Sequence, residues 1–272
     1  MLPDILGLAR RAFRPGTVTM PEPVRPAPSR AFDGLMDLFD RAGRVTVLTG
    51  AGMSVASGLG TYRDDEGHDV SEKPIAYRHF LIDPAARLSQ WRRSVSDARG
   101  FSAASPNAGH VALARMAATG KVRVVTQNVD GLHARAGTPE GSLVELHGNA
   151  AYAECPECRR TGLLLEHAEA AEAGTVPTCS VDGHWLQPAV TMFGMQPLRS
   201  RLARAEEWAR DCDLFMVVGT SLAVTPAGYL PVDAGNAGAG VVVINPGPMR
   251  RSVKACLVVR EDASAVLASL VR

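Results

Sequence analysis

Three cysteines in the second half of the chain have the spacing of a metal site. Cys155 and Cys158 form a C-x-x-C pair, and Cys179 follows after a short gap. Three thiolates and one further donor can close a tetrahedron around Zn²⁺. Asp182 and His184 are the candidates for the fourth ligand, and Asp182 is favoured because it keeps the two-residue spacing. The pattern therefore predicts a structural zinc site, and the alternative is that the cysteines are only buried side chains.

A glycine-rich segment after an apolar run is typical of nucleotide binding. Residues 45–49 lead directly into Gly50, Ala51 and Gly52, and small residues such as Ser54 follow. Glycine lets the backbone approach a pyrophosphate, and the next helix can direct its N–H groups at the anion. The third glycine of the dehydrogenase pattern is missing, and no acidic residue clearly ends a second strand to hold a ribose. The segment favours a dinucleotide but disfavours a standard dehydrogenase.

Other predicted strands also end in small or amide-bearing residues. These segments are Gln127-Asn128-Val129-Asp130, Gly219-Thr220-Ser221 and Asn245-Pro246. Turn chemistry alone explains Asn and Asp at such places, and a lone loop histidine such as His147 is more often structural than catalytic. Because the carboxyl ends of parallel strands meet at one edge of a sheet, the four segments together predict a nucleotide crevice.

The elements that must position these groups alternate between strands and helices. Apolar runs predict strands at 45–49, 122–126, 214–218, 241–244 and 257–259. Helical spacing predicts helices at 109–118, 200–212 and 264–271, and Asp33 is expected to cap a further helix that contains Leu35 and Phe39. Continuously apolar strands between helices indicate an α/β, Rossmann-like parallel sheet with helices on both faces.

Two stretches interrupt this alternation, at 62–106 and 151–188, and the second holds the three cysteines. Both leave and re-enter the sheet domain, so we expect one small domain with a helical part and a zinc-binding part. The larger, nucleotide-binding domain would comprise residues 29–61, 107–150 and 189–272. Five prolines between positions 15 and 28 predict a flexible N-terminal arm at residues 1–28.

Composition excludes several classes of partner. The net charge of +1 gives no electrostatic reason to expect nucleic acid, and no apolar run reaches the roughly 18 residues of a membrane span. An odd number of cysteines without a secretory signal argues for a reducing compartment, so we expect a cytoplasmic protein. Cys212 and Cys256 stand among apolar residues and are expected to be buried.

Several blocks, in order, resemble the sirtuin family. GAGMSVASGLGTYR (50–63) is similar to the signature G-A-G-x-S-x-x-S-G-I-P-x-F-R. The other matching blocks are PNAGHVAL (106–113), TQNVDGLH (126–133), ELHGN (145–149), FGM (193–195), GTSLAVTPA (219–227) and INPGP (244–248). Together these blocks cover about residues 44–250. The segments at residues 73–80 and 126–137 look most like the class II branch of the family. The resemblance implies an NAD-dependent protein-lysine deacylase that releases nicotinamide and O-acyl-ADP-ribose.

Carried across position by position, the resemblance makes His147 the general base. The residues implied to contact the ADP-ribose part of NAD are Ala51, Gly52, Ser54, Gly219, Thr220, Ser221 and Asn245. Those implied to line the nicotinamide and its ribose are Tyr62, Arg63, Gln127, Asn128 and Asp130. Val190 and Phe193 would flank the acyl-lysine of a protein substrate in an apolar tunnel that excludes water. Zinc would be held by Cys155, Cys158, Cys179 and Asp182, where the family has a second C-x-x-C.

The chain departs from the family pattern at other positions too. Gly60 replaces the usual proline, Tyr62 a phenylalanine, and Met195 an acidic residue. None of these changes removes the proposed base, so catalysis is expected, while the rate and the preferred acyl group stay open. Desuccinylating sirtuins look to carry a Tyr-x-x-Arg pair after the first motif, but here Gly67-His68-Asp69-Val70 follows, with acidic residues at 64–66 nearby. Like charges would repel a dicarboxylic acyl group, so uncharged acyl groups are predicted over succinyl or malonyl.

Two other activities fit the same motifs. A protein ADP-ribosyltransferase would pass the ribosyl group stably to protein, whereas a deacylase gives free O-acyl-ADP-ribose. A non-catalytic sensor of NAD or ADP-ribose would release no nicotinamide, and the presence of His147 argues against it.

Overall fold

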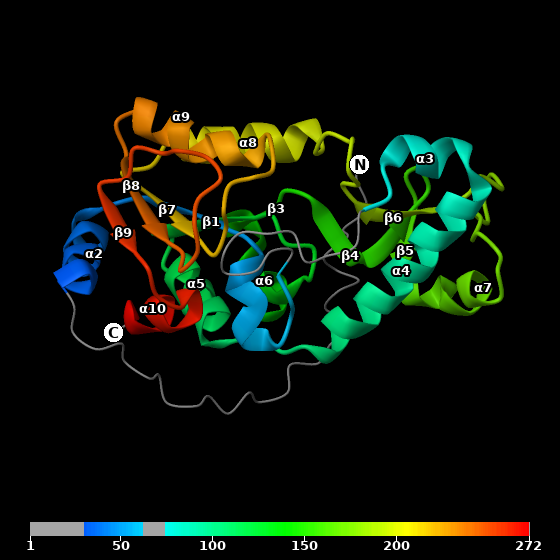
Figure 1. Cartoon of the computed structure of the whole chain (residues 1–272), viewed down its shortest axis with the longest axis horizontal. Coiled ribbons are helices and arrows are strands. Elements are labelled where there is room, and N and C mark those ends of the chain that lie inside the picture. Colours follow the sequence, from blue (N-terminus) through cyan, green and yellow to red (C-terminus); the bar gives the residue numbers. More distant parts are fainter. Residues whose placement is uncertain (1–29, 62–73, 272) are drawn as a thin grey trace.

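The structure, a computed structural model, describes residues 30–61 and 74–271, so the predicted arm at 1–28 lies outside it. Six strands form one sheet in the order β3-β2-β1-β7-β8-β9, and every neighbouring pair is parallel (Figure 1). The strands are β1 (Val45–Thr49), β2 (Val122–Thr126), β3 (Leu143–Glu145), β7 (Leu214–Val218), β8 (Gly240–Ile244) and β9 (Leu257–Val259). The predicted parallel sheet is confirmed, with β3 as an additional edge strand.

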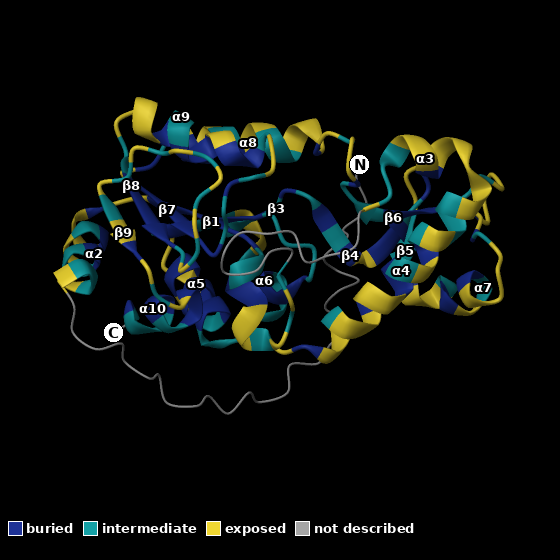
Figure 2. Cartoon of the chain, viewed as in Figure 1, coloured by how far each residue is buried: buried dark blue, intermediate teal, exposed yellow. Residues whose placement is uncertain are grey.

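Helices cover both faces of this sheet (Figure 1). One face packs against α2 (Arg30–Arg41), α5 (Ala108–Ala118) and α10 (Ala263–Ser269), and the other against α8 (Arg199–Arg210) and α9 (Leu230–Asn236). The central strands β1 and β7 are therefore buried along their whole length (Figure 2). Asp33 lies inside α2, so the prediction that it caps the helix was wrong; in the first turn its charge favours the helix dipole.

The strand order reverses between β1 and β7. From β1 the chain continues to β2 and β3 on one side, and β7, β8 and β9 extend the sheet on the other. At such a switch point the loops after the two strands diverge and leave a crevice at the carboxyl edge. The 3-10 helix η1 (Ala51–Ser57) follows β1 directly, so the predicted cofactor residues start at this crevice.

A third hydrophobic cluster, which we call the small cluster, surrounds a small antiparallel sheet in the order β5-β4-β6. It comprises α3 (Tyr77–Ile82), α4 (Pro84–Ala103), β4 (Gly148–Glu154), β5 (Thr161–Leu163), η3 (Leu164–His167), α7 (Ala168–Glu172) and β6 (Gln187–Val190). Trp91 on α4 is fully buried there and donates to the carbonyl of Leu186 at 3.0 Å. The domain boundaries expected after residues 150 and 188 fall inside strands of the small sheet. The first lies inside β4, which starts at the residue after His147, and the second lies inside β6.

Short elements complete the described chain: α6 (Leu132–Arg135), η2 (Glu140–Ser142) and η4 (Ala227–Tyr229). None of the described helices combines the length and apolarity needed to cross a membrane. Cys212 is buried as expected. Cys256 is exposed, so its predicted burial was wrong; it immediately precedes β9, a strand at the edge of the sheet.

Candidate active site and metal site

Glycines allow the loops after β1 and β7 to touch at the switch point. The amide of Gly52 donates to the carbonyl of Gly219 at 2.9 Å. A Cβ atom on Gly52 would lie 2.9 Å from the Cα of Gly219, and one on Gly50 would lie 2.6 Å from the Cβ of Thr220. Gly219 also has a φ of +60°, a conformation that favours glycine. Side chains are thus excluded where a dinucleotide backbone would have to approach.

Replacing Gly52 with alanine is expected to lower the unfolding temperature by about 2–10 °C, because overpacking against the Gly219 backbone costs about 1–3 kcal/mol. Gly100→Ala is the matched control, since a Cβ there meets nothing within 4 Å and the position lies inside α4. Alanine in a helix is favoured over glycine, so the control should melt at or above the wild type. Thermal unfolding of both variants measures the difference. Equal unfolding temperatures for Gly52→Ala and Gly100→Ala would contradict the packing argument.

The amide and carboxylate predicted at the end of β2 form a hydrogen-bonded chain with the loop after β1. The side-chain amide of Asn128 donates to the carbonyl of Gly50 at 3.0 Å and to Ser54 Oγ at 3.1 Å. Ser54 Oγ donates in turn to Asp130 Oδ2 at 2.7 Å. Burial raises the pKa of Asp130, while hydrogen bonds from the Leu132 amide and Ser54 lower it. The chain fixes these three side chains relative to one another.

His147 lies at the same edge, directly after β3 and Leu146. Its Nδ1 lies 3.0 Å from the carbonyl oxygen of Gln127. A carbonyl can only accept, so Nδ1 carries the proton and Nε2 keeps its lone pair in the neutral ring. Burial lowers the pKa of His147, and the bond to the Gln127 carbonyl partly opposes this. The imidazole is therefore neutral near pH 7 and can accept a proton at Nε2.

The start of β4, directly after His147, is tied to β6. The carbonyl of His147 accepts a hydrogen bond from the Thr191 amide at 2.7 Å, and Gly148 pairs with Val190. Gly148 has a φ of +90°, and a Cβ atom there would overlap the carbonyl oxygen of Ala189. Phe193, two residues after Thr191, is 56% exposed although it is aromatic. Val190 and Phe193 thus lie on either side of Thr191 in the chain, and Phe193 leaves apolar surface exposed.

The remaining predicted cofactor residues lie at the same carboxyl edge or outside the described chain. Gln127 donates from Nε2 to Thr220 Oγ1 at 3.0 Å, which links the ends of β2 and β7. Ser221 follows Thr220 after β7, and Asn245 follows β8 and donates to the Gly247 carbonyl at 2.8 Å. Ala51 begins η1. Tyr62 and Arg63 lie outside the described residues.

Two buried histidines beneath the crevice were not predicted to have a role. His133 Nε2 lies 2.9 Å from Thr49 Oγ1, and the ring of His110 lies 4.7 Å from that of His133. Burial lowers the pKa of both, that of His110 to about 4, so both are neutral. Asn107 caps α5 and donates to the Met53 carbonyl at 2.8 Å, which anchors η1. The histidines belong to the blocks 106–113 and 126–133, but nothing in those blocks reveals that they touch.

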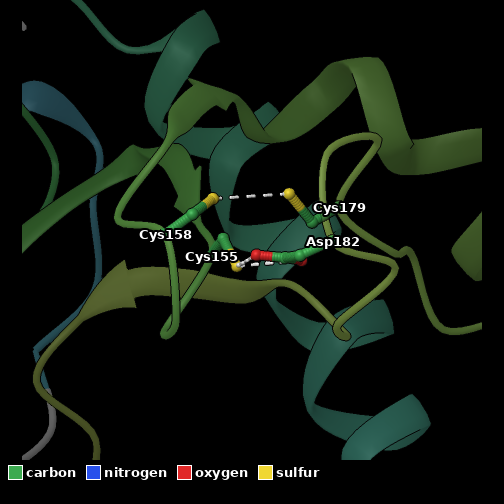
Figure 3. A group of neighbouring side chains, drawn as sticks. All are labelled: Cys155, Cys158, Cys179 and Asp182. Carbon is green, nitrogen blue, oxygen red and sulfur yellow. Dashed lines mark hydrogen bonds between the residues drawn. The ribbon is translucent and has the colours of Figure 1, made fainter.

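The three predicted zinc cysteines and Asp182 converge in the small cluster (Figure 3). The sulfurs of Cys158 and Cys179 lie 3.6 Å apart, and the Cys155 sulfur lies 3.4 and 3.6 Å from the two Asp182 oxygens. In a tetrahedral zinc site, bonds of about 2.3 Å to sulfur and about 2.1 Å to oxygen place two sulfurs about 3.8 Å apart and sulfur and oxygen about 3.6 Å apart. The donor set therefore fits zinc.

His184, the alternative fourth ligand, is not among the four clustered side chains. Its ring packs on Trp185, with centroids 4.7 Å apart, and its backbone amide donates to Asp182 Oδ1 at 3.0 Å. This amide bond orients the Asp182 carboxylate and is one of the causes that lower its pKa to about 2. The geometry supports Asp182 over His184.

Comparison with known proteins adds independent information. The model of the Sir2 family matches residues 50–226. NAD-dependent protein deacetylase 1 of Bradyrhizobium diazoefficiens is 36% identical over 238 residues, which cover 87% of this chain and 94% of that protein. The NAD-dependent protein deacetylase of Rhodopseudomonas palustris is 35% identical over 250 residues, 91% of this chain and 99% of its own length.

Solved structures agree with the sequence relatives. A complex of Sir2 with a p53 peptide and NAD⁺ superposes with a TM-score of 0.78 at 27% identity and covers 88% of this chain and 96% of that one. Sir2Tm bound to a propionylated peptide gives 0.77 at 26% identity, with the same coverage. The family match spans more than half of the chain, and the relatives align over almost their whole length. The chain belongs to the Sir2 family.

Proposed function

We propose that the protein is an NAD-dependent protein-lysine deacylase, which transfers the acyl group of a modified lysine to ADP-ribose and releases nicotinamide. The observation that carries the proposal is the position of His147. Its neutral imidazole lies at the carboxyl edge of the sheet and is hydrogen-bonded to the Gln127 carbonyl. The residue after Gln127 is Asn128, whose side chain is linked by hydrogen bonds through Ser54 to Asp130. The relatives in Bradyrhizobium diazoefficiens and Rhodopseudomonas palustris are named NAD-dependent protein deacetylases.

The strand ends would hold the two halves of NAD on either side of the switch point. Ala51, Gly52 and Ser54, together with Gly219, Thr220, Ser221 and Asn245, would bind the ADP-ribose part. Gln127, Asn128 and Asp130, with Tyr62 and Arg63, would line the nicotinamide and its ribose. NAD supplies an electrophilic ribose carbon with nicotinamide as the leaving group. The polar chain from Asn128 to Asp130 fixes those contacts before the ligand arrives, which reduces the reorganisation needed for reaction.

His147 would act as the general base. With Nδ1–H directed to the Gln127 carbonyl, Nε2 can take a proton from a ribose hydroxyl so that this oxygen can attack the acyl carbon. Val190 pairs with Gly148, the residue after His147, and Phe193 is exposed three residues further along the chain. These two side chains would hold the acyl-lysine against apolar surface. Once a substrate covers this surface, water that would otherwise hydrolyse NAD is excluded.

Incubation with NAD and an acetyl-lysine peptide tests the proposal. We expect equimolar nicotinamide, deacetylated peptide and free O-acetyl-ADP-ribose. Chromatography measures the two small molecules, and mass spectrometry measures the peptide. Stable attachment of labelled ADP-ribose to protein without peptide deacetylation would instead indicate a transferase. Binding of NAD without nicotinamide release would indicate a sensor.

Asn128→Ala and Asp130→Ala are each expected to reduce NAD cleavage about a hundredfold, because misplaced binding groups have effects of that size. Exchange of labelled nicotinamide into NAD measures this cleavage step alone, because it does not require the later proton transfer to His147. Asn236→Ala, an exposed position at the end of α9, is the matched control and should exchange at the wild-type rate. Unchanged exchange in both Asn128→Ala and Asp130→Ala would refute the proposed pocket.

The natural substrates would be acylated proteins in the cytoplasm, with no nucleic-acid or membrane partner. The proposed preference for uncharged acyl groups rests on residues 64–70, which lie outside the described chain. Higher kcat/KM for succinyl-lysine than for acetyl-lysine peptides would contradict it.

A further inference from the structure

A hydrogen bond between two side chains closes the turn that carries His147. The side-chain amide of Asn149 donates to Glu145 Oε1 at 2.8 Å, so the bond spans residues 145–149 with His147 at their centre. Glu145 is the last residue of β3, and Asn149 is the second residue of β4. The two ends of the turn are thus joined through their side chains as well as through the backbone.

Strand pairing fixes the two ends of this turn unequally. Before His147 the pairing is regular, because Glu145 still pairs with the last residue of β2. After His147 the pairing of β4 with β6 shifts register between Gly148 and Ala153. Asn149 lies within this irregular stretch, where a regular ladder does not hold the backbone. A side-chain bond at Asn149 therefore supplies a constraint that the sheet does not.

The amide of Asn149 is fixed through both of its polar atoms. Oδ1 accepts a hydrogen bond from the Ala151 amide at 3.0 Å, and Nδ2 donates to Glu145. Nδ2 also lies close to Gly131, where a Cβ atom would come within 3.1 Å of it. One partner needs an acceptor and the other needs a donor, and an asparagine side chain offers both. An aspartate of the same shape would satisfy Ala151 but not Glu145.

Glu145 can accept this hydrogen bond with or without a charge. Burial raises its pKa to about 7, while Arg201 on α8 and the Asn149 amide oppose the shift and Asp130 adds to it. A neutral carboxyl group keeps a carbonyl oxygen that can accept from an amide. Protonation of Glu145 therefore leaves the turn closed.

The position of the His147 imidazole depends on this turn. Nδ1 is bonded to the Gln127 carbonyl, and the carbonyl of His147 accepts from the Thr191 amide. These bonds fix the tautomer and the direction in which the chain leaves, but Nε2 also moves with the backbone of the turn. Displacing a reacting group by about 1 Å can slow a reaction about a hundredfold.

We propose that Glu145 and Asn149 are positioning residues, whose hydrogen bond keeps the turn closed and so places Nε2 of His147 for proton transfer. The inference rests on the proposed function, because it takes His147 as the general base. The polar chain from Asn128 to Asp130 is held by its own hydrogen bonds. Opening the turn should therefore slow proton transfer and leave NAD cleavage nearly intact.

Asn149→Asp tests the inference, because it removes the donor to Glu145 and keeps the acceptor for Ala151. In buffer well above pH 7, where Glu145 is ionised, two carboxylates would face each other and the turn should open. We expect kcat for deacetylation of an acetyl-lysine peptide to fall about tenfold or more, and exchange of labelled nicotinamide into NAD to stay within about twofold of the wild type. Asn236→Asp makes the same change at the exposed end of α9 and should alter neither rate.

A compensating substitution separates the hydrogen bond from other effects. Combining Asn149→Asp with Glu145→Gln restores one donor and one acceptor in exchanged positions, so the double variant should regain most of the lost kcat. Glu145→Gln alone keeps an acceptor oxygen, so it should reduce kcat less than Glu145→Leu, which has none.

Equal losses of deacetylation and nicotinamide exchange in Asn149→Asp would indicate a general structural effect and overturn the inference. A double variant as slow as Asn149→Asp would do the same, and so would wild-type deacetylation by Asn149→Asp. Equal kcat for Glu145→Gln and Glu145→Leu would contradict the inference even if Asn149→Asp does not fold. In all these cases an active wild type leaves the proposed function standing. A wild type that neither exchanges nicotinamide nor deacetylates would remove that function, and the inference with it.

Discussion

Replacing His147 with alanine is expected to lower kcat/KM for deacylation by about two to four orders of magnitude, the usual effect of losing a general base. The variant keeps the glycine loops and the chain from Asn128 to Asp130, since neither involves the imidazole. ADP-ribose should therefore bind with nearly wild-type affinity, and nicotinamide should still be released. The loss would fall on the step in which Nε2 accepts a proton.

Two controls separate this chemical role from a structural one. His147→Asn places an amide where Nδ1 now donates to the Gln127 carbonyl, so it can keep that hydrogen bond but supplies no base. His79→Ala changes an exposed histidine on α3 and should retain full activity. If His147→Asn deacylated peptides within a few-fold of the wild type, His147 would not be the base.

The pH profile gives a further check on His147. Burial lowers its pKa, so the neutral form persists to a pH below the ordinary histidine value of about 6.5. The wild-type kcat/KM should accordingly stay constant as pH falls through that value and decline only in more acidic buffer. The residual activity of His147→Ala should lack this acidic decline.

The central sheet could be predicted because its strands are buried on both faces. Val45–Thr49 and Leu214–Val218 are apolar or small throughout, and such runs show in the sequence without any knowledge of their neighbours. Leu143–Glu145 has only three residues and lies at the sheet edge, so it leaves no comparable pattern. The strands of the small sheet are also short or interrupted, as β4 is by a register shift, and they were not predicted individually.

The site was predictable to the extent that its residues follow strands. Asn128 and Thr220 lie at strand ends, and the parallel order of the sheet brings those ends together. The contact between His110 and His133 depends instead on how α5 and α6 pack, which no local pattern encodes.

Removing zinc is expected to destabilise the small cluster strongly. Cys155 and Cys179 are buried in the same cluster as Phe80 and Trp91, so the metal would connect two loops at the edge of that core. Zinc ligation contributes about 10 kcal/mol or more to the folding of small modules, and chelation should lower the unfolding temperature by more than about 10 °C. Untreated protein should hold one zinc per chain by elemental analysis, and metal-free protein of unaltered stability would contradict the site.

Paired cysteine variants distinguish ligation from the general effect of losing a thiol. Cys155→Ser should lose zinc, because a hydroxyl is a poor replacement for a thiolate ligand. Cys256→Ser changes an exposed cysteine whose sulfur, among the hydrogen bonds of the described chain, donates only to the Val241 carbonyl, at 3.1 Å. This control should keep both the metal and the stability of the wild type.

The fourth ligand decides how tightly the metal is held. Asp182→Ala should lose zinc, whereas His184→Ala should keep it, since the histidine contributes to the site through its backbone amide, which the substitution preserves. Asp182→Cys should bind zinc more tightly than the wild type, because a fourth thiolate is a softer donor than a carboxylate. Competition with a chromogenic chelator ranks the three variants. Zinc retained by Asp182→Ala and lost by His184→Ala would transfer the role to the imidazole. The order Asp182→Cys, wild type, Asp182→Ala, from tightest to weakest, would identify the carboxylate as the ligand that completes the tetrahedron.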